Sequence, residues 1–317
     1  MQKYRMLRDW LQAGSTAAGK TDSNAAAPDA GGGLDGIALC AAPTTTDGQL
    51  ALVHTPGYIN AVVQGQLDAT QQRDIGFPWS PEMVERSRRS VGATVAAARD
   101  AQAHGVAANL AGGTHHAYSD HGGGFCVFND MAVAARLMQA EHGRLPSRHH
   151  TLSTRRQHLQ IAIVDLDVHQ GNGTAHIFAG DDSVFTLSMH GEHNFPFYKE
   201  RSDLDYPLPD RCSDEAYLTI LDQALDALDN RFVPDLLLYL AGADPHEGDR
   251  LGRMALTHSG LKERDRRVFD WAWQRRIPLA FAMGGGYGKR IEDTLQAQVN
   301  TFEIAVGYRK RWSQLIR

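Results

Sequence analysis

The chain has 317 residues, of which 42% are hydrophobic and 22% charged, as is typical of globular proteins with a substantial core. The formal net charge of −5 leaves no basic footprint for binding nucleic acid. No apolar run approaches the roughly 20 residues of a membrane span, and Cys40, Cys126 and Cys212 form no CxxC pair. We therefore expect a cytoplasmic protein that binds neither nucleic acid nor membranes, and its oligomeric state stays open.

Two segments are predicted to lack regular structure. Residues Ala13–Gly36 are rich in Ala, Gly, Ser and Asp, which indicates a flexible loop. Residues Gly143–His158 are polar and basic, which indicates a surface insertion. The three histidines of this second segment have no acid or thiol beside them, so we do not interpret them as metal ligands. We expect one domain over residues 1–317, with these two segments on its surface.

The remaining chain alternates between predicted helices and strands. Helices are expected from Ser80-Pro81 to Gly105, over Asn129–Gln139, from Ser213 to about Leu228 and after Thr257. Strands are expected in "AANLAGG" (107–113), Ile161–Leu166, "SVFTLSMH" (183–190), "DLLLYLAGAD" (235–244) and "IPLAFAMGGGYG" (277–288), with a long loop between 190 and 213. Continuous apolar strands are typical of parallel sheets buried on both faces. The order therefore predicts an α/β fold with a doubly wound, mainly parallel sheet flanked by helices.

Chemically capable side chains follow four of these strands. They are His115 and His116; Asp165, Asp167 and His169; Asp244; and Tyr287. The carboxyl ends of the strands form the edge at which open α/β sheets build their sites. We therefore expect these side chains to meet.

The residue types indicate metal-assisted hydrolysis of an amide. Asp167 and His169, at i and i+2, can share one cation with Asp244, and three protein ligands leave a coordination position open for catalysis. Oxygen and imidazole ligands suit Zn²⁺ or Fe²⁺, and the sequence does not separate them. Either histidine of the adjacent pair can exchange protons with water and a leaving amine, one oriented by Asp165 and the other by Asn172. Tyr287 can donate a hydrogen bond where negative charge develops.

With these residues in view, the sequence resembles the histone deacetylase superfamily, which also contains acetylpolyamine amidohydrolases and, more distantly, arginases. The resemblance rests on "GGTHHAYSDHGGGFCVFND" (112–130), "VDLDVHQGNG" (164–173), "LSMHGEHNFPF" (187–197), "LAGADPHEGDRLG" (240–252) and "MGGGYG" (283–288). Several of these motifs are most similar to the class IV deacetylases and their bacterial relatives. The resemblance implies the arginase/deacetylase fold and deacylation of an acylated lysine.

The resemblance also implies a role for each site residue. Zinc would be bound by Asp167, His169 and Asp244, with His116 as general acid/base, Asn172 beside it, and His115 as the electrostatic partner paired to Asp165. Tyr287 would bind the scissile carbonyl. A narrow acyl-lysine channel would be lined by Gly124, Phe125, Phe195 and Leu251, and a structural potassium ion held by Asp165, Asp167, His169, Ser188 and Met189. Cys126 is interpreted as a packing residue, because the metal mechanism needs no thiol.

The chain departs from this family pattern at its start and leaves alternatives open. "MQKYRML" resembles a segment that relatives place after a first strand, so a short edge strand is expected to be missing. One alternative is a hydrolase of the same fold acting on an acylated small amine, such as an acetylated polyamine. Another is a homologue that binds acyl groups without turnover. An arginase-like site with two metals is disfavoured, because Gly171 and Asn172 stand where a second metal would want acids.

Overall fold

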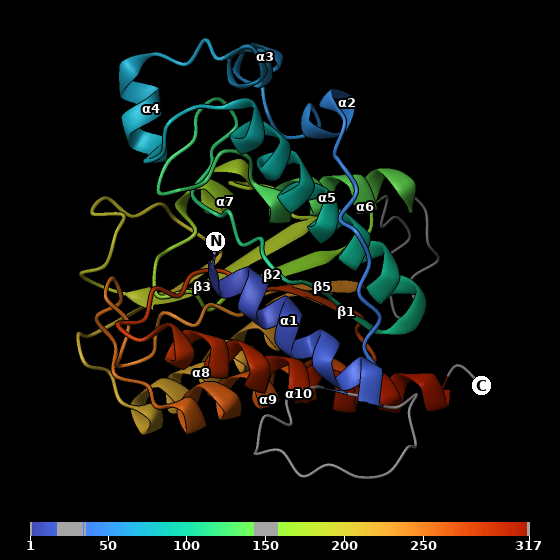
Figure 1. The fold of residues 1–317 in the computed structure, drawn as a ribbon. Coiled ribbons are helices and arrows are strands. Elements are labelled where there is room, and N and C mark those ends of the chain that lie inside the picture. Colours follow the sequence, from blue (N-terminus) through green and yellow to red (C-terminus); the bar gives the residue numbers. More distant parts are fainter. Residues whose placement is uncertain (1, 18–33, 35, 143–157, 316–317) are drawn as a thin grey trace, which may run out of the picture.

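The computed structural model describes residues 2–17, 34, 36–142 and 158–315, and its centre is one parallel sheet (Figure 1). The strands are β1 (Val106–Asn109), β2 (Ile161–Asp165), β3 (Val184–Gly191), β4 (Leu204–Leu208), β5 (Leu236–Leu240) and β6 (Leu279–Ala282). Their order across the sheet is β1-β6-β5-β2-β3-β4, and every pairing is parallel. This confirms the predicted fold class.

Helices cover both faces of the sheet. They are α1 (Gln2–Ala17), α2 (Asp47–Leu50), α3 (Pro56–Gln64), α4 (Ala69–Ile75), α5 (Pro81–His104), α6 (Asp130–Glu141), α7 (Asn172–Ile177), α8 (Asp214–Arg231), α9 (His258–Gln274) and α10 (Ile291–Leu315). In Figure 1, α5 and α6 lie above the sheet and α8, α9 and α10 below it, with α1 lying against α10. No helix in the described residues is both long and apolar enough to cross a membrane.

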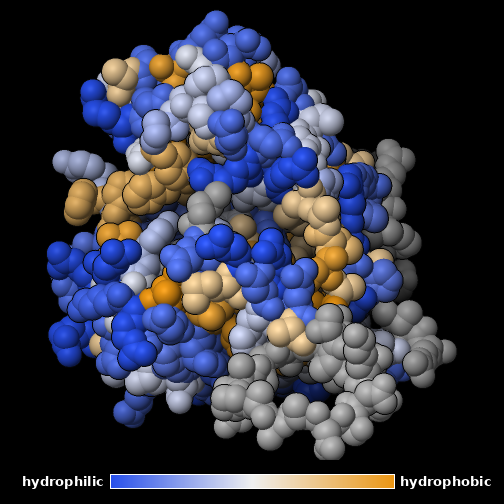
Figure 2. Space-filling model, viewed as in Figure 1, coloured by the Kyte–Doolittle hydropathy of each residue, from blue (hydrophilic) through white to orange (hydrophobic). Residues whose placement is uncertain are grey.

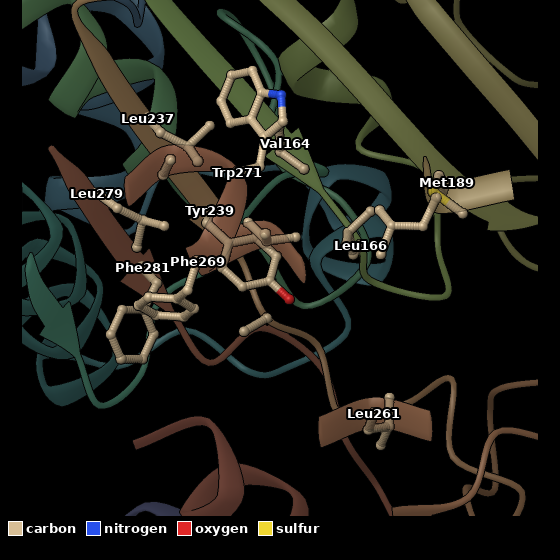
Figure 3. Close-up of a cluster of buried hydrophobic side chains, with 14 of the residues drawn as sticks. Val164, Leu166, Met189, Leu237, Tyr239, Leu261, Phe269, Trp271, Leu279 and Phe281 are labelled. Atoms are coloured by element: carbon tan, nitrogen blue, oxygen red, sulfur yellow. The ribbon is translucent and has the colours of Figure 1, made fainter. Parts of the chain in front are cut away.

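The alternation of side chains along β5 shows how the two cores form. Leu236, Leu238 and Leu240 belong to the core between the sheet and helices α5 and α6. Leu237 and Tyr239 belong to the core between the sheet and helices α8, α9 and α10. All five side chains are fully buried, as expected for a central parallel strand. Figure 3 shows the second core, in which Phe269 of α9 lies between Tyr239 and Phe281.

Several predicted boundaries are confirmed by hydrogen bonds at the helix starts. The side chains of Ser80, Asn129, Ser213 and Thr257 each accept a hydrogen bond from a backbone N–H in the first turn of the helix that follows. Helix α10 and the short helices α2 to α4 were not predicted.

Two sequence-based expectations need correction. Ala13–Ala17 belong to helix α1, so the predicted loop does not begin at Ala13; its residues 18–33 and 35 lie outside the described part of the chain, as do residues 143–157 of the predicted insertion. The expected long loop after β3 contains β4, an edge strand whose half-buried positions and exposed Pro207 hide the usual apolar signal. At the other edge, β1 pairs with β6.

His54 ties the segment before α3 to the loop that follows β1. Its Nδ1 lies 2.9 Å from the carbonyl oxygen of Tyr118, and its Nε2 accepts a hydrogen bond of 3.0 Å from the backbone N–H of Asn129. Both bonds are satisfied together only by the neutral ring with its proton on Nδ1. Burial lowers the pKa of His54 to about 4.

We predict that His54 makes the fold sensitive to acid. As the pH falls below about 6.5, His54 of the unfolded chain binds a proton, whereas His54 of the folded protein stays neutral down to about pH 4. The free energy of unfolding therefore decreases between these two pH values. His54→Gln keeps one donor and one acceptor but does not titrate. Between pH 7 and pH 4, the wild type should lose about 3 kcal/mol more unfolding free energy than this variant. Equal losses in urea titrations would contradict the prediction.

Candidate active site

Four neighbouring strands deliver the predicted site residues to one edge of the sheet. The order β1-β6-β5-β2 places the loops after these strands side by side, and they carry His115 and His116, Tyr287, Asp244, and Asp167 with His169. Parallel strands all end on the same edge, so residues as far apart in the chain as His115 and Tyr287 can meet there. The structure brings the expected side chains together.

Asp167, His169 and Asp244 form the one group in the described residues whose ligand atoms could hold a metal ion, all within 4.8 Å of one another. Nδ1 of His169 lies 3.0 Å from Oδ1 of Asp167 and 3.4 Å from Oδ2 of Asp244. The other carboxylate oxygens are held by backbone N–H groups, from Val168 to Asp244 at 2.9 Å and from Gly285 to Asp167 at 2.7 Å. Three donor atoms are thereby fixed around one point.

The chemistry of this group fits a divalent cation. Oδ2 of Asp244 is buried and has no hydrogen-bond partner in the protein, which is costly for a carboxylate unless a cation compensates. Burial, followed by the charge of Asp167, raises the pKa of Asp244 to about 7. Carboxylate oxygen and imidazole nitrogen are ligands that Zn²⁺ and Fe²⁺ accept.

Gly285 closes the site from the side of β6. A Cβ atom at this position would lie 1.8 Å from Oδ2 of Asp244 and 2.7 Å from Oδ2 of Asp167. Any side chain there would displace the two carboxylates or occupy the space that a cation would take. The glycine-rich turn after β6 is therefore required by the geometry of the ligands.

The adjacent histidines have different hydrogen-bond partners, and their surroundings shift their pKa values in opposite directions. Nδ1 of His115 lies 2.6 Å from Oδ2 of Asp165, whereas Nδ1 of His116 lies 2.7 Å from Oδ1 of Asn172. Burial alone would lower the pKa of His115, but the nearby carboxylates outweigh it and raise this pKa to about 9. Burial and then the charges of His115 and His169 hold the pKa of His116 well below its usual value. The surroundings of His115 thus favour its protonated form, and those of His116 favour the neutral ring.

Tyr287 is held by residues from two distant parts of the chain. Its backbone N–H donates to Oδ2 of Asp249 at 2.6 Å, and its carbonyl accepts from the backbone N–H and Nε of Arg250. Lys3 of α1 is buried beneath the same turn, where its Nζ donates to the carbonyl of Gly286 at 3.0 Å and lies 4.8 Å from the centre of the Tyr287 ring. Burial raises the pKa of the Tyr287 hydroxyl, so this group stays protonated.

The four residues predicted to line the acyl-lysine channel lie around this centre. The Phe195 ring packs edge-on against His116 at 4.9 Å, and a Cβ at Gly124 would lie 2.5 Å from the His116 ring. The ring centres of Phe125 and Tyr287 are 6.2 Å apart. The backbone N–H of Leu251 donates to Oδ1 of Asp249. Phe125, Phe195 and Leu251 are exposed. Figure 2 shows hydrophobic atoms gathered at the left of the view, on the side where the arrow of β3 points in Figure 1.

The surroundings of Cys126 and of two residues predicted to hold potassium, Ser188 and Met189, can also be described. Cys126 is buried, its thiol donates to the carbonyl of Gly124, and burial raises its pKa, so it has no nucleophilic character. Ser188 of β3 is paired in register with Asp165 of β2, which puts Ser188 and Met189 next to the ligand segment. The Ser188 hydroxyl lies 3.0 Å from Nδ1 of His190.

Residues that shape the site without having been predicted include Lys3, Tyr118 and Asp249. Asp249 lies inside the motif "HEGDRLG", so an acid there could have been suspected. It accepts hydrogen bonds from the backbone N–H groups of Leu251, Gly252 and Tyr287. Asp249 therefore joins the segment of Leu251 to the turn that carries Tyr287 (residues 283–288), called the tyrosine turn below. No local pattern marks Lys3, whose partner Gly286 is 283 residues away.

Comparison with known proteins identifies the family of the chain. A family model described as "Histone deacetylase domain" matches residues 24–302. An uncharacterized protein of Picosynechococcus sp. is 48% identical over 244 residues, covering 77% of each chain. Histone deacetylase 2 of Arabidopsis thaliana is 31% identical over 249 residues, which cover 76% of this chain and 61% of that protein. Acetoin utilization protein AcuC of Bacillus subtilis is 30% identical over 260 residues, covering 75% and 63%.

Solved structures share the fold. A histone deacetylase homologue from Aquifex aeolicus superimposes with a TM-score of 0.69 at 25% identity, covering 83% of this chain and 72% of that one. A homologue complexed with SAHA gives a TM-score of 0.69 at 24% identity, covering 86% and 76%. The predicted arginase/deacetylase fold is thereby confirmed.

We predict that the chain binds one equivalent of zinc and that Asp244 is essential for it. Asp244→Asn keeps the shape of the side chain but removes one of the two negative charges, and should weaken zinc binding by more than about 100-fold, because loss of a supporting hydrogen bond alone costs about 10–100-fold. Competition with a chelating dye measures this affinity. Glu247→Gln, at an exposed acid three residues away, is the control and should leave it unchanged. Two tightly bound equivalents would favour the arginase-like alternative.

Proposed function

The chain belongs to the histone deacetylase family, and on that premise we propose that it is a zinc-dependent deacylase that hydrolyses the N-acyl amide of an acyl-lysine side chain. Its homologues in this family are deacetylases, which are hydrolases acting on amide bonds. The observation that carries the proposal is the adjacent histidine pair, one bonded to Asp165 and the other to Asn172, beside three donor atoms that fit a metal. The surroundings of the two histidines also shift their pKa values in opposite directions. Neighbouring groups with pKa values driven apart are the usual mark of acid/base catalysis.

His116 is the proposed general base and acid. Since its Nδ1 is engaged with Asn172, its Nε2 is free to take a proton from the attacking water. The same nitrogen then returns the proton to the departing amine, which leaves as the neutral free lysine. His115 is paired with Asp165, which favours its protonated form, and is proposed to stabilise the negative charge that forms beside it.

Asp167, His169 and Asp244 are the proposed metal ligands, and a bound zinc ion supplies Lewis-acid polarisation of the scissile carbonyl and of water. Two carboxylates offset the formal charge of a divalent ion, so a further donor is needed where the carbonyl oxygen becomes negative. The protonated hydroxyl of Tyr287 is that donor. Ferrous iron fits the same ligands.

The exposed apolar side chains Phe125, Phe195 and Leu251, with Gly124 between the rings of His116 and Phe195, are proposed to contact the lysine stem. A structural potassium ion held by Asp165, Asp167, His169, Ser188 and Met189 is part of the same proposal, supported by the pairing of Asp165 with Ser188. The odd cysteine count of the sequence supports a reducing, cytoplasmic setting.

We predict that Tyr287→Phe lowers kcat of the zinc-loaded protein about 100- to 1,000-fold on an acetyl-lysine peptide, because the oxyanion loses its donor. His116→Gln should lower it about 100- to 10,000-fold, because proton transfer is lost. Zinc affinity should stay unchanged in both variants, since neither residue is a ligand. Tyr198→Phe, at a tyrosine that is 93% exposed, is the matched control.

Undiminished turnover in either active-site variant would refute the proposal. Parallel assays on an acetylated polyamine decide the substrate class, since a higher kcat/KM there than on peptides would favour the small-amine hydrolase. Tight binding of a substrate analogue by wild-type protein that shows no turnover of any substrate would favour the non-catalytic alternative.

A further inference from the structure

A chain of hydrogen bonds runs from the proposed acid/base to a side chain in contact with solvent. Oδ1 of Asn172 lies 2.7 Å from Nδ1 of His116, and Nδ2 of Asn172 donates to the hydroxyl of Tyr118 at 3.1 Å. The hydroxyl of Tyr118 in turn donates to Oε1 of Glu200 at 3.1 Å. The carboxyl group of Glu200 is 38% exposed, whereas His116 is buried.

The carboxylate at the outer end fixes the direction of every bond in this chain. An ionised carboxylate can only accept, so the Tyr118 hydroxyl must donate to Glu200. The oxygen of Tyr118 is then available to accept from Nδ2 of Asn172, which turns Oδ1 of that amide toward His116. An amide oxygen can only accept, so the proton of neutral His116 lies on Nδ1 and its Nε2 carries the lone pair.

This chain of hydrogen bonds is needed because an asparagine amide can face a histidine in either of two orientations. Asp165 beside His115 offers two oxygens and selects an Nδ1 proton whichever way its carboxylate rotates. Asn172 could present either its oxygen or its NH₂ group to His116, and the second arrangement would favour the tautomer protonated on Nε2. That tautomer cannot act as a base at Nε2. The orientation of the amide must therefore be set by something else.

The outer members of the chain are themselves firmly held. The fully buried side chain of Gln170, two residues before Asn172, accepts from the backbone N–H of Glu200 at 2.8 Å and donates to its carbonyl at 2.7 Å. The ring of Tyr118 stacks on His121, with centroids 4.4 Å apart and planes 15° apart, and contacts His176 at 5.0 Å. Tyr118 and Glu200 thus meet because Gln170 and these rings place them.

We propose that Tyr118 and Glu200 are positioning residues that hold His116 in its Nδ1-protonated tautomer by orienting Asn172. Neither side chain touches the ligand group, and both act through the amide. Their effect on the rate rests on the proposed function, whereas their effect on the tautomer does not.

Nitrogen-15 NMR of zinc-loaded protein labelled at histidine tests the proposal, because two-bond correlations show which ring nitrogen carries the proton. The His116 signals are assigned by their absence from His116→Gln. Wild type should show the Nδ1-protonated form. Tyr118→Phe removes the acceptor for Asn172, and Glu200→Gln can donate to Tyr118 and reverse the chain, so both should populate the Nε2-protonated form. The His115 signals should not move.

Kinetics supply the second measurement. Both variants should lower kcat on an acetyl-lysine peptide about fivefold to tenfold, the scale of one orienting hydrogen bond, and change KM less than about twofold. Glu192→Gln, an exposed acid outside the chain of hydrogen bonds, is the control and should match wild type in both measurements.

An unchanged His116 tautomer in both Tyr118→Phe and Glu200→Gln would overturn the inference, even in an active enzyme. If the wild type turned over no acylated substrate while the tautomer shifted as expected, the proposed function would fail and the inference would stand.

Discussion

The arrangement of the site depends on three buried acids at one edge of the sheet, whose negative charges must be compensated. Asp165, Asp167 and Asp244 are each at most 3% exposed, and like charges held this close repel strongly in a medium from which water is excluded. Backbone N–H groups of Val168 and Gly285 bind the two ligand carboxylates, and His115 pairs with Asp165. Oδ2 of Asp244 has no hydrogen-bond partner and lies 3.4 Å from Nδ1 of His169, an arrangement that fits a divalent cation.

The scaffold behind the acids is also polar. The guanidinium of Arg264, a residue of α9 that is 1% exposed, donates to the carbonyls of Leu166 and Gly242 at 3.3 and 2.7 Å and pairs with Asp265. Each carbonyl belongs to a segment that carries a ligand, so Arg264 fixes the spacing between the segments after β2 and β5. A core that was purely apolar could not satisfy these carbonyls, because no strand pairs with them.

Much of this could be predicted from residues alone, for physical reasons. Apolar runs such as Leu236–Leu240 reveal buried strands, and polar residues at their ends must share an edge once the strands are parallel. Strand β4 was missed because its half-buried positions and the exposed Pro207 lack that signal. Tyr118 and Glu200 were missed because their pairing spans 82 residues and depends on side-chain geometry, which no local pattern encodes.

Lys3 has a consequence for how the site assembles. The contact of its Nζ with the carbonyl of Gly286 joins residues 283 positions apart, so it closes a loop that contains almost the whole chain. Loop-closure entropy delays such contacts relative to local ones. Completion of the tyrosine turn is therefore coupled to the docking of α1 on α10. Transient release of α1 would free that turn and with it the backbone N–H of Gly285 that binds Asp167, whereas Asp244 would keep its hydrogen bond from Val168.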